Sequence, residues 1–384
     1  MTEGYTLYAL PHSLYSGRAR SYLIKQGITF RELSTGHESF KNEVLPKAQL
    51  PTIPTLVTPD GEVIRDGAAI IAHFEEPRGW PSLPDTPRQR TLSLLFDVIG
   101  TDGLLRPAMH YRWNFPDDNL AFVRRHFLHA QRDTPEREAK TDHMMDRMRH
   151  AARIFGVTEA SQSAVEALYL DLLTALDDHF EQFPYLFGDR PSLGDFGLLG
   201  PLYAHLGRDP YPVGLMQRQA PSLYRWVERM NRGDGDAPEF FGAGDDFLPG
   251  DAIPPTLIRV LQVLAEDFVP ETAAAATTLE AWLATEAPAA GEPAVGRLAV
   301  SPGTAQFLLR GVPIEALAQP HRFYLLQRVQ ACYDALTPEA QQDVFGCLEQ
   351  VGMETLLTLA LSREIHRQQN LEVWGGGAVR GVSL

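Results

Sequence analysis

The chain has 384 residues, of which 44% are hydrophobic and 22% charged, and its formal net charge at pH 7 is −15. These values are ordinary for a soluble globular protein, and the length predicts two or three domains with hydrophobic cores. The acidic charge argues against nucleic acid and against an anionic membrane as partners, and no apolar run approaches the length of a membrane span.

The first residues lack the basic and apolar regions of a signal peptide, so we expect a cytoplasmic protein. The chain has two cysteines, Cys332 and Cys347, which are too few for a disulfide framework. Its 12 histidines do not cluster at the spacing of metal ligands, and we therefore predict no metal site.

The chain opens with a predicted strand, helix and strand. Residues 5–10 are rich in β-forming side chains, and residues 14–26 place apolar side chains on one helical face before Gly27 ends the helix. Residues 28–33 predict the second strand.

A hairpin and a short helix follow. Residues 55–57 and 63–65 flank a Pro-Asp-Gly turn and predict the hairpin, and residues 68–76 predict the helix. Together with the preceding elements, this order is typical of a thioredoxin-like domain.

Residues 77–90 are rich in proline and predict a linker, after which the pattern becomes helical. This pattern predicts an all-helical second domain. Its predicted helices cover residues 88–103, 119–131, 136–154, 163–182, 196–206 and 222–230.

A second break is predicted at residues 233–250, which are rich in glycine and aspartate. Beyond it we expect a strand pair at residues 297–300 and 306–310, and a flexible tail at residues 375–377. Helices are expected there at residues 255–268, 273–286, 322–336, 338–351 and 354–369.

The motif Ser13-Leu14-Tyr15-Ser16 stands at the first junction between strand and helix. A sulfur beside a helix N-terminus meets unpaired N–H groups and the positive end of the helix dipole, which favour the thiolate. The Ser13 hydroxyl could donate one more hydrogen bond to such a sulfur, and Tyr15, Ser16 and Tyr8 are further candidates for this contact. The alternative is that Ser13 only caps the helix, since serine is a preferred N-cap residue.

Two further motifs accompany the hairpin. Pro54 directly precedes the strand at residues 55–57, which suits a cis peptide bond, although an edge-strand or turn proline is the alternative. Asp66-Gly67 opens the following helix, and helix N-termini bind anions through their N–H groups. The alternative for Asp66 is an ordinary N-cap.

An aromatic and basic cluster, Met-His-Tyr-Arg-Trp-Asn-Phe, occupies residues 109–115. Such a cluster can line a substrate pocket in which Arg112 takes an anion. The alternative is core packing with a surface charge, because aromatic side chains are mostly buried. Further along, Ser192-Leu193-Gly194-Asp195 precedes an apolar run and predicts a capping-box helix start with a structural role.

In their order and spacing these motifs resemble the glutathione transferase superfamily over residues 5 to about 231. Ser13 stands where cysteine-type members carry their cysteine, and Gly17-Arg18-Ala19-Arg20 is similar to the basic continuation of that motif. The resemblance implies an α/β thioredoxin-like N-terminal domain plus an all-α C-terminal domain, to which this chain adds a mainly helical extension. The expected boundaries are a thioredoxin-like domain at 1–80, a linker at 81–90, a helical domain at 91–231, a linker at 232–250 and the extension at 251–384.

The resemblance also implies a homodimeric enzyme that activates the thiol of its co-substrate glutathione for attack on a small-molecule electrophile. Ser13 would be the catalytic residue that stabilises the thiolate. Ile53, Pro54, Asp66 and Gly67 would bind glutathione, with Asp66 holding the γ-glutamyl ammonium. The family usually has serine after this acid, and because Gly67 lacks that hydroxyl we expect weakened rather than abolished binding. A second-substrate pocket would be lined by His110, Tyr111, Arg112 and Trp113.

Two other functions compete with this one. A non-catalytic glutathione-binding or scaffolding protein that keeps the fold is favoured by Gly67 and by the long extension. A thiol–disulfide oxidoreductase is disfavoured because Cys332 is the first cysteine of the chain.

Overall fold

The computed structural model describes residues 4–296 and 299–377. The first part of the chain forms a four-stranded mixed sheet of order β2-β1-β3-β4, in which β1 is parallel to β2 and antiparallel to β3. Its elements are β1 (Tyr5–Tyr8), α1 (Leu14–Lys25), β2 (Phe30–Leu33), η1 (Phe40–Val44), α2 (Leu45–Ala48), β3 (Thr55–Val57), β4 (Val63–Arg65), α3 (Gly67–Glu75) and η2 (Glu76–Arg78).

The two faces of this sheet are both buried because its strands alternate between them. Leu7, Leu56 and Ile64 lie opposite one another on adjacent strands and pack into the main core with α1 and α3. On the other face, Tyr8 and Val63 pack against η1 and α2. The predicted thioredoxin-like domain is confirmed.

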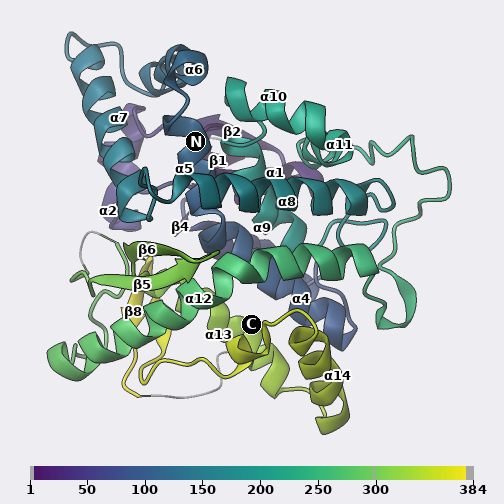
Figure 1. Cartoon of the computed structure of the whole chain (residues 1–384). Helices are drawn as coiled ribbons and strands as arrows, with labels where there is room; N and C mark the ends of the chain where they lie inside the picture. Colours follow the sequence, from purple (N-terminus) through teal and green to yellow (C-terminus); the bar gives the residue numbers. More distant parts are fainter. Residues whose placement is uncertain (1–3, 297–298, 378–384) are drawn as a thin grey trace.

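The second part is all-helical, and Figure 1 shows these helices as the upper and central part of the molecule. Its elements are α4 (Pro87–Val98), η3 (Ile99–Gly103), α5 (Leu105–Trp113), α6 (Pro116–His129), α7 (Arg137–Ile154), α8 (Gln162–Phe180), α9 (Leu193–Ala204), α10 (Pro210–Gln219) and α11 (Pro221–Met230). Sequence periodicity missed α5 and α10, which are short.

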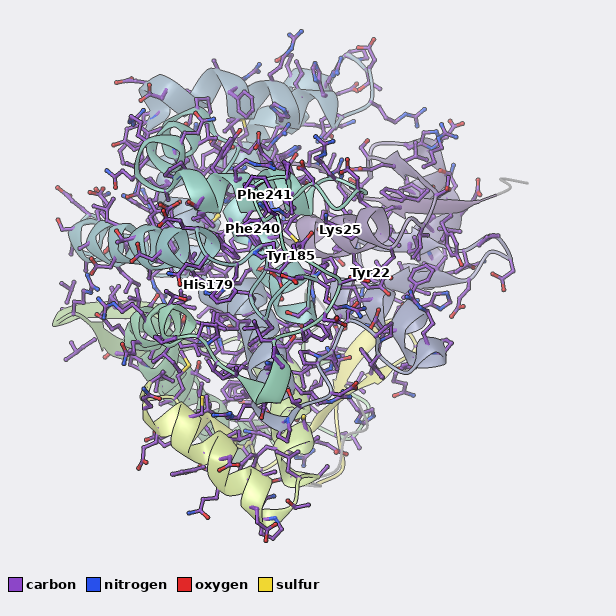
Figure 2. All side chains as sticks on the ribbon, turned by 90° about the vertical axis from the view of Figure 1, so that its right-hand side faces the viewer. Tyr22, Lys25, His179, Tyr185, Phe240 and Phe241 are labelled. Atoms are coloured by element: carbon purple, nitrogen blue, oxygen red, sulfur yellow. The ribbon has the colours of Figure 1, made fainter. Side chains whose placement is uncertain are left out.

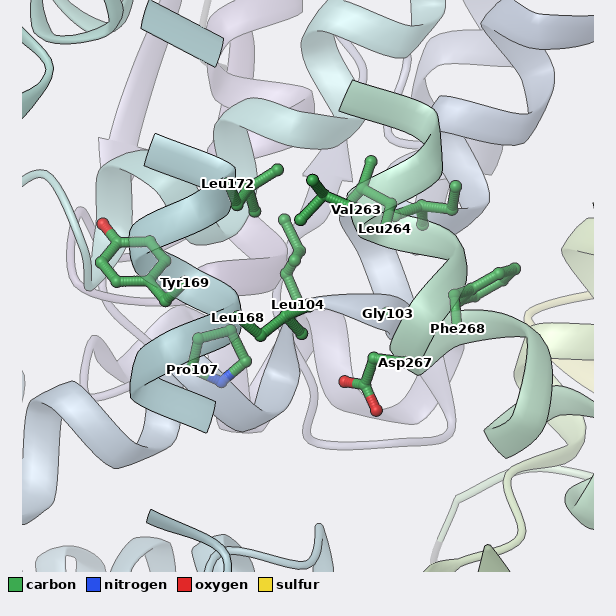
Figure 3. Close-up of a pocket in the computed structure, with 11 residues that line it drawn as sticks. Gly103, Leu104, Pro107, Leu168, Tyr169, Leu172, Val263, Leu264, Asp267 and Phe268 are labelled. Atoms are coloured by element: carbon green, nitrogen blue, oxygen red, sulfur yellow. The ribbon is translucent and has the colours of Figure 1, made fainter. Parts of the chain in front are cut away.

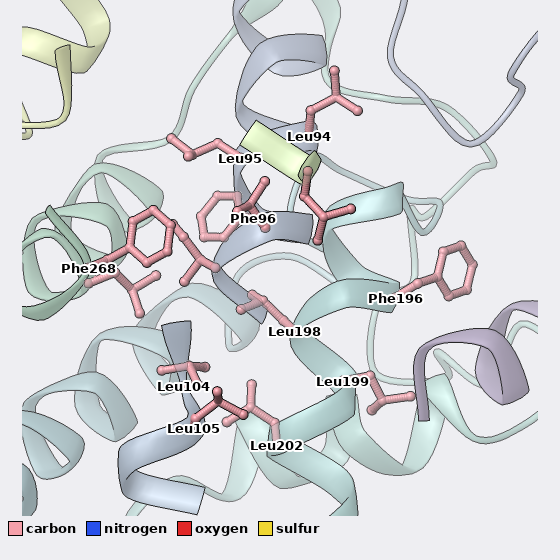
Figure 4. Close-up of a cluster of buried hydrophobic side chains, with 14 of the residues drawn as sticks. Leu94, Leu95, Phe96, Leu104, Leu105, Phe196, Leu198, Leu199, Leu202 and Phe268 are labelled. Carbon is pink, nitrogen blue, oxygen red and sulfur yellow. The ribbon is translucent and has the colours of Figure 1, made fainter. Parts of the chain in front are cut away.

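The helix α9 is the centre of this core, since almost all its residues are buried. Figure 4 shows Leu198 and Leu202 of α9 among Phe96 of α4 and Leu104 beside η3. At its start, Asp195 accepts hydrogen bonds from the N–H and hydroxyl of Ser192 at 2.9 and 2.8 Å, so the predicted capping box is confirmed. Burial raises the pKa of Asp195 to about 6.

Close backbone contact brings η3 against α9. A Cβ atom added to Gly100 would lie 2.2 Å from the carbonyl carbon of Gly197, so a side chain at Gly100 would force these helices apart. This crossing places Asp97, Thr101 and Asp102 near the start of α1 and α3, where the candidate site lies.

The extension packs along both preceding parts of the molecule. In Figure 1 it runs from green to yellow, with α12 beside α8 and α13 beside α4. Its elements are η4 (Pro249–Asp251), α12 (Pro255–Glu286), β5 (Thr304–Leu309), β6 (Val312–Leu317), α13 (Pro320–Asp334), α14 (Pro338–Glu349), η5 (Glu354–Leu357), β7 (Ile365–Gln368) and β8 (Leu371–Trp374).

Three predictions for the extension were wrong. The expected helices 255–268 and 273–286 form one helix that continues through Pro270, because α8 and β5 bury apolar residues on both sides of the proline. The strand partner of β5 is β6 rather than residues 299–300, and residues 297–298 lie outside the described residues. The two-residue turn Arg310-Gly311, with φ of 50° and 81°, was the missed hairpin signal.

The third error concerns residues 354–369, which were expected as a helix. One 3₁₀ turn at Glu354–Leu357 is followed by the hairpin β7–β8. This hairpin is held against β4, where Asn370 donates to the carbonyl of Val63 at 2.8 Å and accepts from the N–H of Arg65 at 3.0 Å. Tertiary contact with the sheet edge overrides local helix propensity here.

The segment expected as a linker at residues 232–250 is tied down at both ends. Leu248 donates to the carbonyl of Phe187 at 2.8 Å, and the carbonyl of Asp234 accepts from Lys25 at 3.0 Å. Figure 2 shows this face, with Phe240 and Phe241 near Tyr185 and Lys25, and the Phe241 side chain is fully exposed. Among the described helices, none combines the length and apolarity needed to cross a membrane.

Candidate functional site

The N-terminal ends of α1 and α3 meet at the candidate site. Leu14, Tyr15 and Arg18 line a small crevice together with Asp66 and Gly67. A Cβ atom on Gly67 would lie 3.3 Å from Cδ of Arg18 and 3.7 Å from the carbonyl oxygen of Tyr15. The fold therefore brings the first and third sequence motifs together.

Ser13 occupies the N-cap position of α1, with extended backbone angles of φ −94° and ψ 118°. Its side chain makes no capping hydrogen bond, and its hydroxyl bonds to no residue that the structure describes. The residue is half-buried. The hydroxyl therefore stands beside the helix N-terminus with its donor unused, which distinguishes Ser13 from an ordinary cap.

The three other hydroxyl candidates differ in access. The hydroxyl of Tyr8 is 2.6 Å from Oγ of Ser39, so it is already hydrogen-bonded. Ser16 is completely buried, with its Oγ 3.5 Å from the N–H of Leu10. Tyr15 is 39% exposed as a residue, but burial and the nearby Asp102 carboxylate raise the pKa of its hydroxyl.

The Ile53–Pro54 peptide bond is cis. The carbonyl oxygen of Pro54 accepts a hydrogen bond from the N–H of Asp66 at 3.0 Å. The second and third motifs are therefore joined through the backbone.

Asp66 uses one carboxylate oxygen as the N-cap of α3. Oδ1 accepts from the N–H of Ala68 at 2.8 Å and from the N–H of Ala69 at 3.4 Å. Its φ of 83° is rare for a residue with a side chain, and its hydrogen bonds with Pro54, Ala68, Ala69 and Ile70 hold it there.

The second oxygen of Asp66 faces a histidine of the extension. Nε2 of His321, at the start of α13, lies 3.6 Å from Oδ2 of Asp66, and Nδ1 lies 2.8 Å from Oδ2 of Asp102. The three side chains are largely buried, with exposed fractions of 15% for Asp66, 13% for His321 and 1% for Asp102. His321 therefore bridges two carboxylates between the thioredoxin-like part and the helical part.

The pKa values follow from this geometry. Burial alone would lower the pKa of His321, but the Asp102 and Asp66 carboxylates outweigh it and raise that pKa well above the ordinary value. Burial would likewise raise the pKa of Asp66, but the hydrogen bond and charge of His321 hold it well below its usual range. At neutral pH we therefore treat the pair as imidazolium and carboxylate.

Further ion pairs surround this bridge. Arg18 pairs with Asp97 and donates to Thr101 at 3.3 Å, so the space beside Gly67 is filled by an arginine. Arg322, next to the bridging histidine, donates to the carbonyl of Asp102 at 2.8 Å. Sequence reasoning missed His321, because no local pattern links the start of a helix late in the chain to Asp66.

The four residues expected in a second-substrate pocket lie in different surroundings. His110 and Tyr111 are buried, the first 2.8 Å from Oε1 of Glu166 and the second among aromatic rings. Arg112 is buried and binds an anion of the protein itself, since it donates to Asp209 at 2.6 and 3.0 Å.

Arg112 also connects the helical part to the Ser13 loop, because its Nη1 donates to the carbonyl of His12 at 2.8 Å. Together with Trp113 it lines a crevice of about 230 Å³ between α5, α6 and α7, which is also lined by Pro116, Leu120, Val123 and Arg149. The indole Nε1 of Trp113 has no hydrogen-bond partner among the described residues. The second-substrate role of all four residues stays a prediction.

A second cavity, shown in Figure 3, lies between α5, α8 and α12 and is lined mainly by apolar side chains, with Asp267 at its edge. Its volume of about 10 Å³ leaves room for at most one water molecule. Within residues 4–296 and 299–377, no group of three or more His, Cys, Asp or Glu side chains is arranged to hold a metal ion.

Family models match two regions of the chain. The model described as glutathione S-transferase, N-terminal domain matches residues 7–82, and the model described as glutathione S-transferase, C-terminal domain matches residues 159–229. No curated protein matches the chain.

Several solved structures are similar over about two thirds of the chain. The β-etherase LigF from Sphingobium sp. strain SYK-6 is 16% identical, with 62% of this chain and 98% of that chain covered and a TM-score of 0.41. A glutathione S-transferase from Methylobacterium radiotolerans, solved with glutathione sulfonate, is 18% identical, with 65% and 99% covered and a TM-score of 0.36. FzlA from C. crescentus is 19% identical, with 66% and 97% covered and a TM-score of 0.35. At such scores these likenesses carry no argument about function.

Proposed function

This chain belongs to the glutathione S-transferase superfamily, and we propose that it binds glutathione and activates the thiol for attack on a small electrophile. The observation that carries the proposal is the unused hydroxyl of Ser13 at the start of α1. A thiolate held there would accept a hydrogen bond from this hydroxyl and would face the positive end of the helix dipole. Both contacts favour the thiolate over the thiol. The thiolate is the form that attacks an electrophile.

The remaining contacts of glutathione follow from the other motifs. The backbone beside the cis Ile53–Pro54 bond would hold the cysteinyl part, and the start of α3 would hold the γ-glutamyl part. Gly67 offers an N–H there but no hydroxyl. We propose the Trp113 crevice for the second substrate, with Arg112 as a positioning residue that fixes the His12 carbonyl next to Ser13.

The Asp66–His321 pair bears directly on this proposal. The glutathione ammonium would need the carboxylate oxygen that faces His321, so the peptide must either displace the imidazolium or share Asp66 with it. This contact specifically favours the second candidate function, a non-catalytic protein that keeps the fold while its extension occupies the site. Glutathione affinity is therefore expected to be weak in the full chain.

Two measurements decide between these functions. Calorimetric titration with glutathione comes first. If neither wild type nor His321→Gln binds glutathione, the activating function is excluded and the non-catalytic function is supported. If glutathione binds, the ultraviolet absorbance of its thiolate is then followed against pH in wild type and Ser13→Ala. A bound-thiol pKa below that of free glutathione, and higher in Ser13→Ala, supports activation by Ser13. Identical titration curves for wild type and Ser13→Ala would show that the Ser13 hydroxyl does not stabilise the thiolate. Tyr15 would then be the next candidate.

We further propose a cytoplasmic homodimer, in keeping with the resemblance noted in the sequence. Sedimentation equilibrium of the full chain measures its assembly directly, and a monomer across the concentration range would contradict this part of the proposal.

A further inference from the structure

A groove of about 370 Å³ separates α3 from the extension. Its floor is formed by the small side chains of Ala68, Ala69 and Ala72, and two aromatic rings, Trp80 and Tyr324, line it as well. This volume is in the range of small-molecule sites, which are mostly apolar with a few polar groups. The floor belongs to the thioredoxin-like part, whereas Tyr324 lies on α13, so the groove exists only because the extension docks there.

Arg328 of α13 supplies a buried cation to this groove. It is 8% exposed, and its guanidinium makes no hydrogen bond within residues 4–296 and 299–377. Its nearest carboxylate is Asp97 at 3.8 Å, which pairs more closely with Arg18. A buried guanidinium normally fills its five donors, so Arg328 is left with unused hydrogen-bonding capacity.

Three other lining side chains have unused donors as well. Tyr324, His73 and His366 line the groove and form no side-chain hydrogen bond in the described part of the chain. Burial raises the pKa of Tyr324, so its hydroxyl stays protonated and can donate.

The groove is less acidic than the protein as a whole. The formal charges of Arg328 and Arg367 there balance the carboxylates of Glu62 and Glu76, in a chain of net charge −15. The guanidinium of Arg328 lies 5.5 Å from the ring centre of Trp80, so charge and a flat apolar surface are adjacent.

We propose that this groove binds a small organic anion with a flat apolar body, whose acidic group pairs with Arg328 and whose body lies against Trp80 and the alanines of α3. A carboxylate or sulfonate would accept from Arg328 and from Tyr324. The role of the extension would then be to complete a ligand site that the transferase-like part lacks.

The probe for this site is 2-naphthoate, and its neutral amide is the comparison ligand. Calorimetry on the full chain should detect 2-naphthoate binding at one site, with much weaker binding of 2-naphthamide. Arg328→Gln should weaken 2-naphthoate binding by about 10- to 100-fold, the effect of one charged hydrogen bond. Arg147→Gln, which removes an exposed arginine on α7, should leave the affinity unchanged.

A second variant distinguishes loss of ligand binding from loss of folding. Ala72→Phe leaves Arg328 intact but fills the groove floor, and it should abolish binding while keeping the circular dichroism spectrum. The proposal is overturned if 2-naphthoate shows no binding at millimolar concentration, if the amide binds equally well, or if a folded Arg328→Gln variant keeps full affinity. Competitive displacement by glutathione would also overturn it, since the groove would then be part of the glutathione site.

Discussion

The helices α1 and α3 both begin with a polar residue at the N-cap, yet the two residues are used differently. Ser13 has a free hydroxyl beside α1, whereas Asp66 caps α3 with one oxygen and faces His321 with the other. One helix start is therefore open to a ligand, and the other is already filled by the extension. A capping residue type alone does not reveal whether a helix start serves folding or binding.

The largest expected effect is on stability, from His321→Gln. This change removes the cation between Asp66 and Asp102, and breaking a buried ion pair costs about 3–5 kcal/mol of unfolding free energy. Denaturant unfolding measures it, with His143→Gln on the surface of α7 as the control. A loss below about 1 kcal/mol, the value of exposed pairs, would show that the two helix starts do not differ as described.

Ser13→Ala tests the open helix start. Loss of one charge-assisted hydrogen bond predicts conjugation about 10- to 100-fold slower below the thiol pKa, through a contribution of about 1.5–3 kcal/mol. Stability should not change, because the hydroxyl bonds to no described residue. The rate is measured with a chromogenic electrophile, and Ser163→Ala, at an exposed position of α8, is the control. Equal rates for the two variants would remove Ser13 from the chemistry.

The His321 contribution should depend on pH in a definite direction. A histidine whose folded pKa is raised stabilises fully below its ordinary pKa of about 6.5, and this stabilisation is lost as pH rises through the folded value. The slope reaches about 1.4 kcal/mol per pH unit. His12, His179 and His205 have pKa values lowered mainly by burial and act in the opposite direction, so the stability difference between wild type and His321→Gln is the quantity to follow. A difference that grows above pH 7 would contradict the assignment.

The capping role and the ammonium-binding role of the Asp66 carboxylate can be tested with two substitutions. Asp66→Asn and Asp66→Ala both remove the charge, but asparagine keeps a capping oxygen, so Asp66→Ala should be less stable by about 1 kcal/mol. If Asp66 also holds the ammonium, both variants should bind glutathione more weakly than wild type. Equal stability of the two variants would mean that the cap contributes nothing measurable.

The smallest effect is expected from Gly67→Ser, which adds the hydroxyl usual in the superfamily. The new Cβ would lie 3.3 Å from Cδ of Arg18, the flexible part of a long side chain, so little stability should be lost. One neutral hydrogen bond of about 1 kcal/mol predicts glutathione affinity several-fold tighter. Calorimetry measures the change, and weaker binding would indicate that Arg18 cannot move aside.

Much of the first 230 residues could be predicted because its signals are local. The Pro-Asp-Gly hairpin, the end of α1 at Gly27 and the Ser192–Asp195 capping box depend on residues close together in the chain, and the structure confirms each of them. The surroundings of the motif residues were harder to predict from the sequence. Tyr111 is buried, whereas Arg112 binds Asp209 and also lines the crevice beside Trp113, so their predicted role in a second-substrate pocket stays a prediction.

The sequence by itself indicated the family, the order of strands and helices along the thioredoxin-like part and the position of the two helix starts, since periodicity, turn residues and capping act over a few residues. Only the tertiary structure decided that His321 faces Asp66 and that Asn370 of the β7–β8 turn binds the edge of β4. These contacts join residues far apart in the chain, and a buried charge or an exposed strand edge selects its partner by proximity in the folded molecule. No local pattern at either residue records that choice.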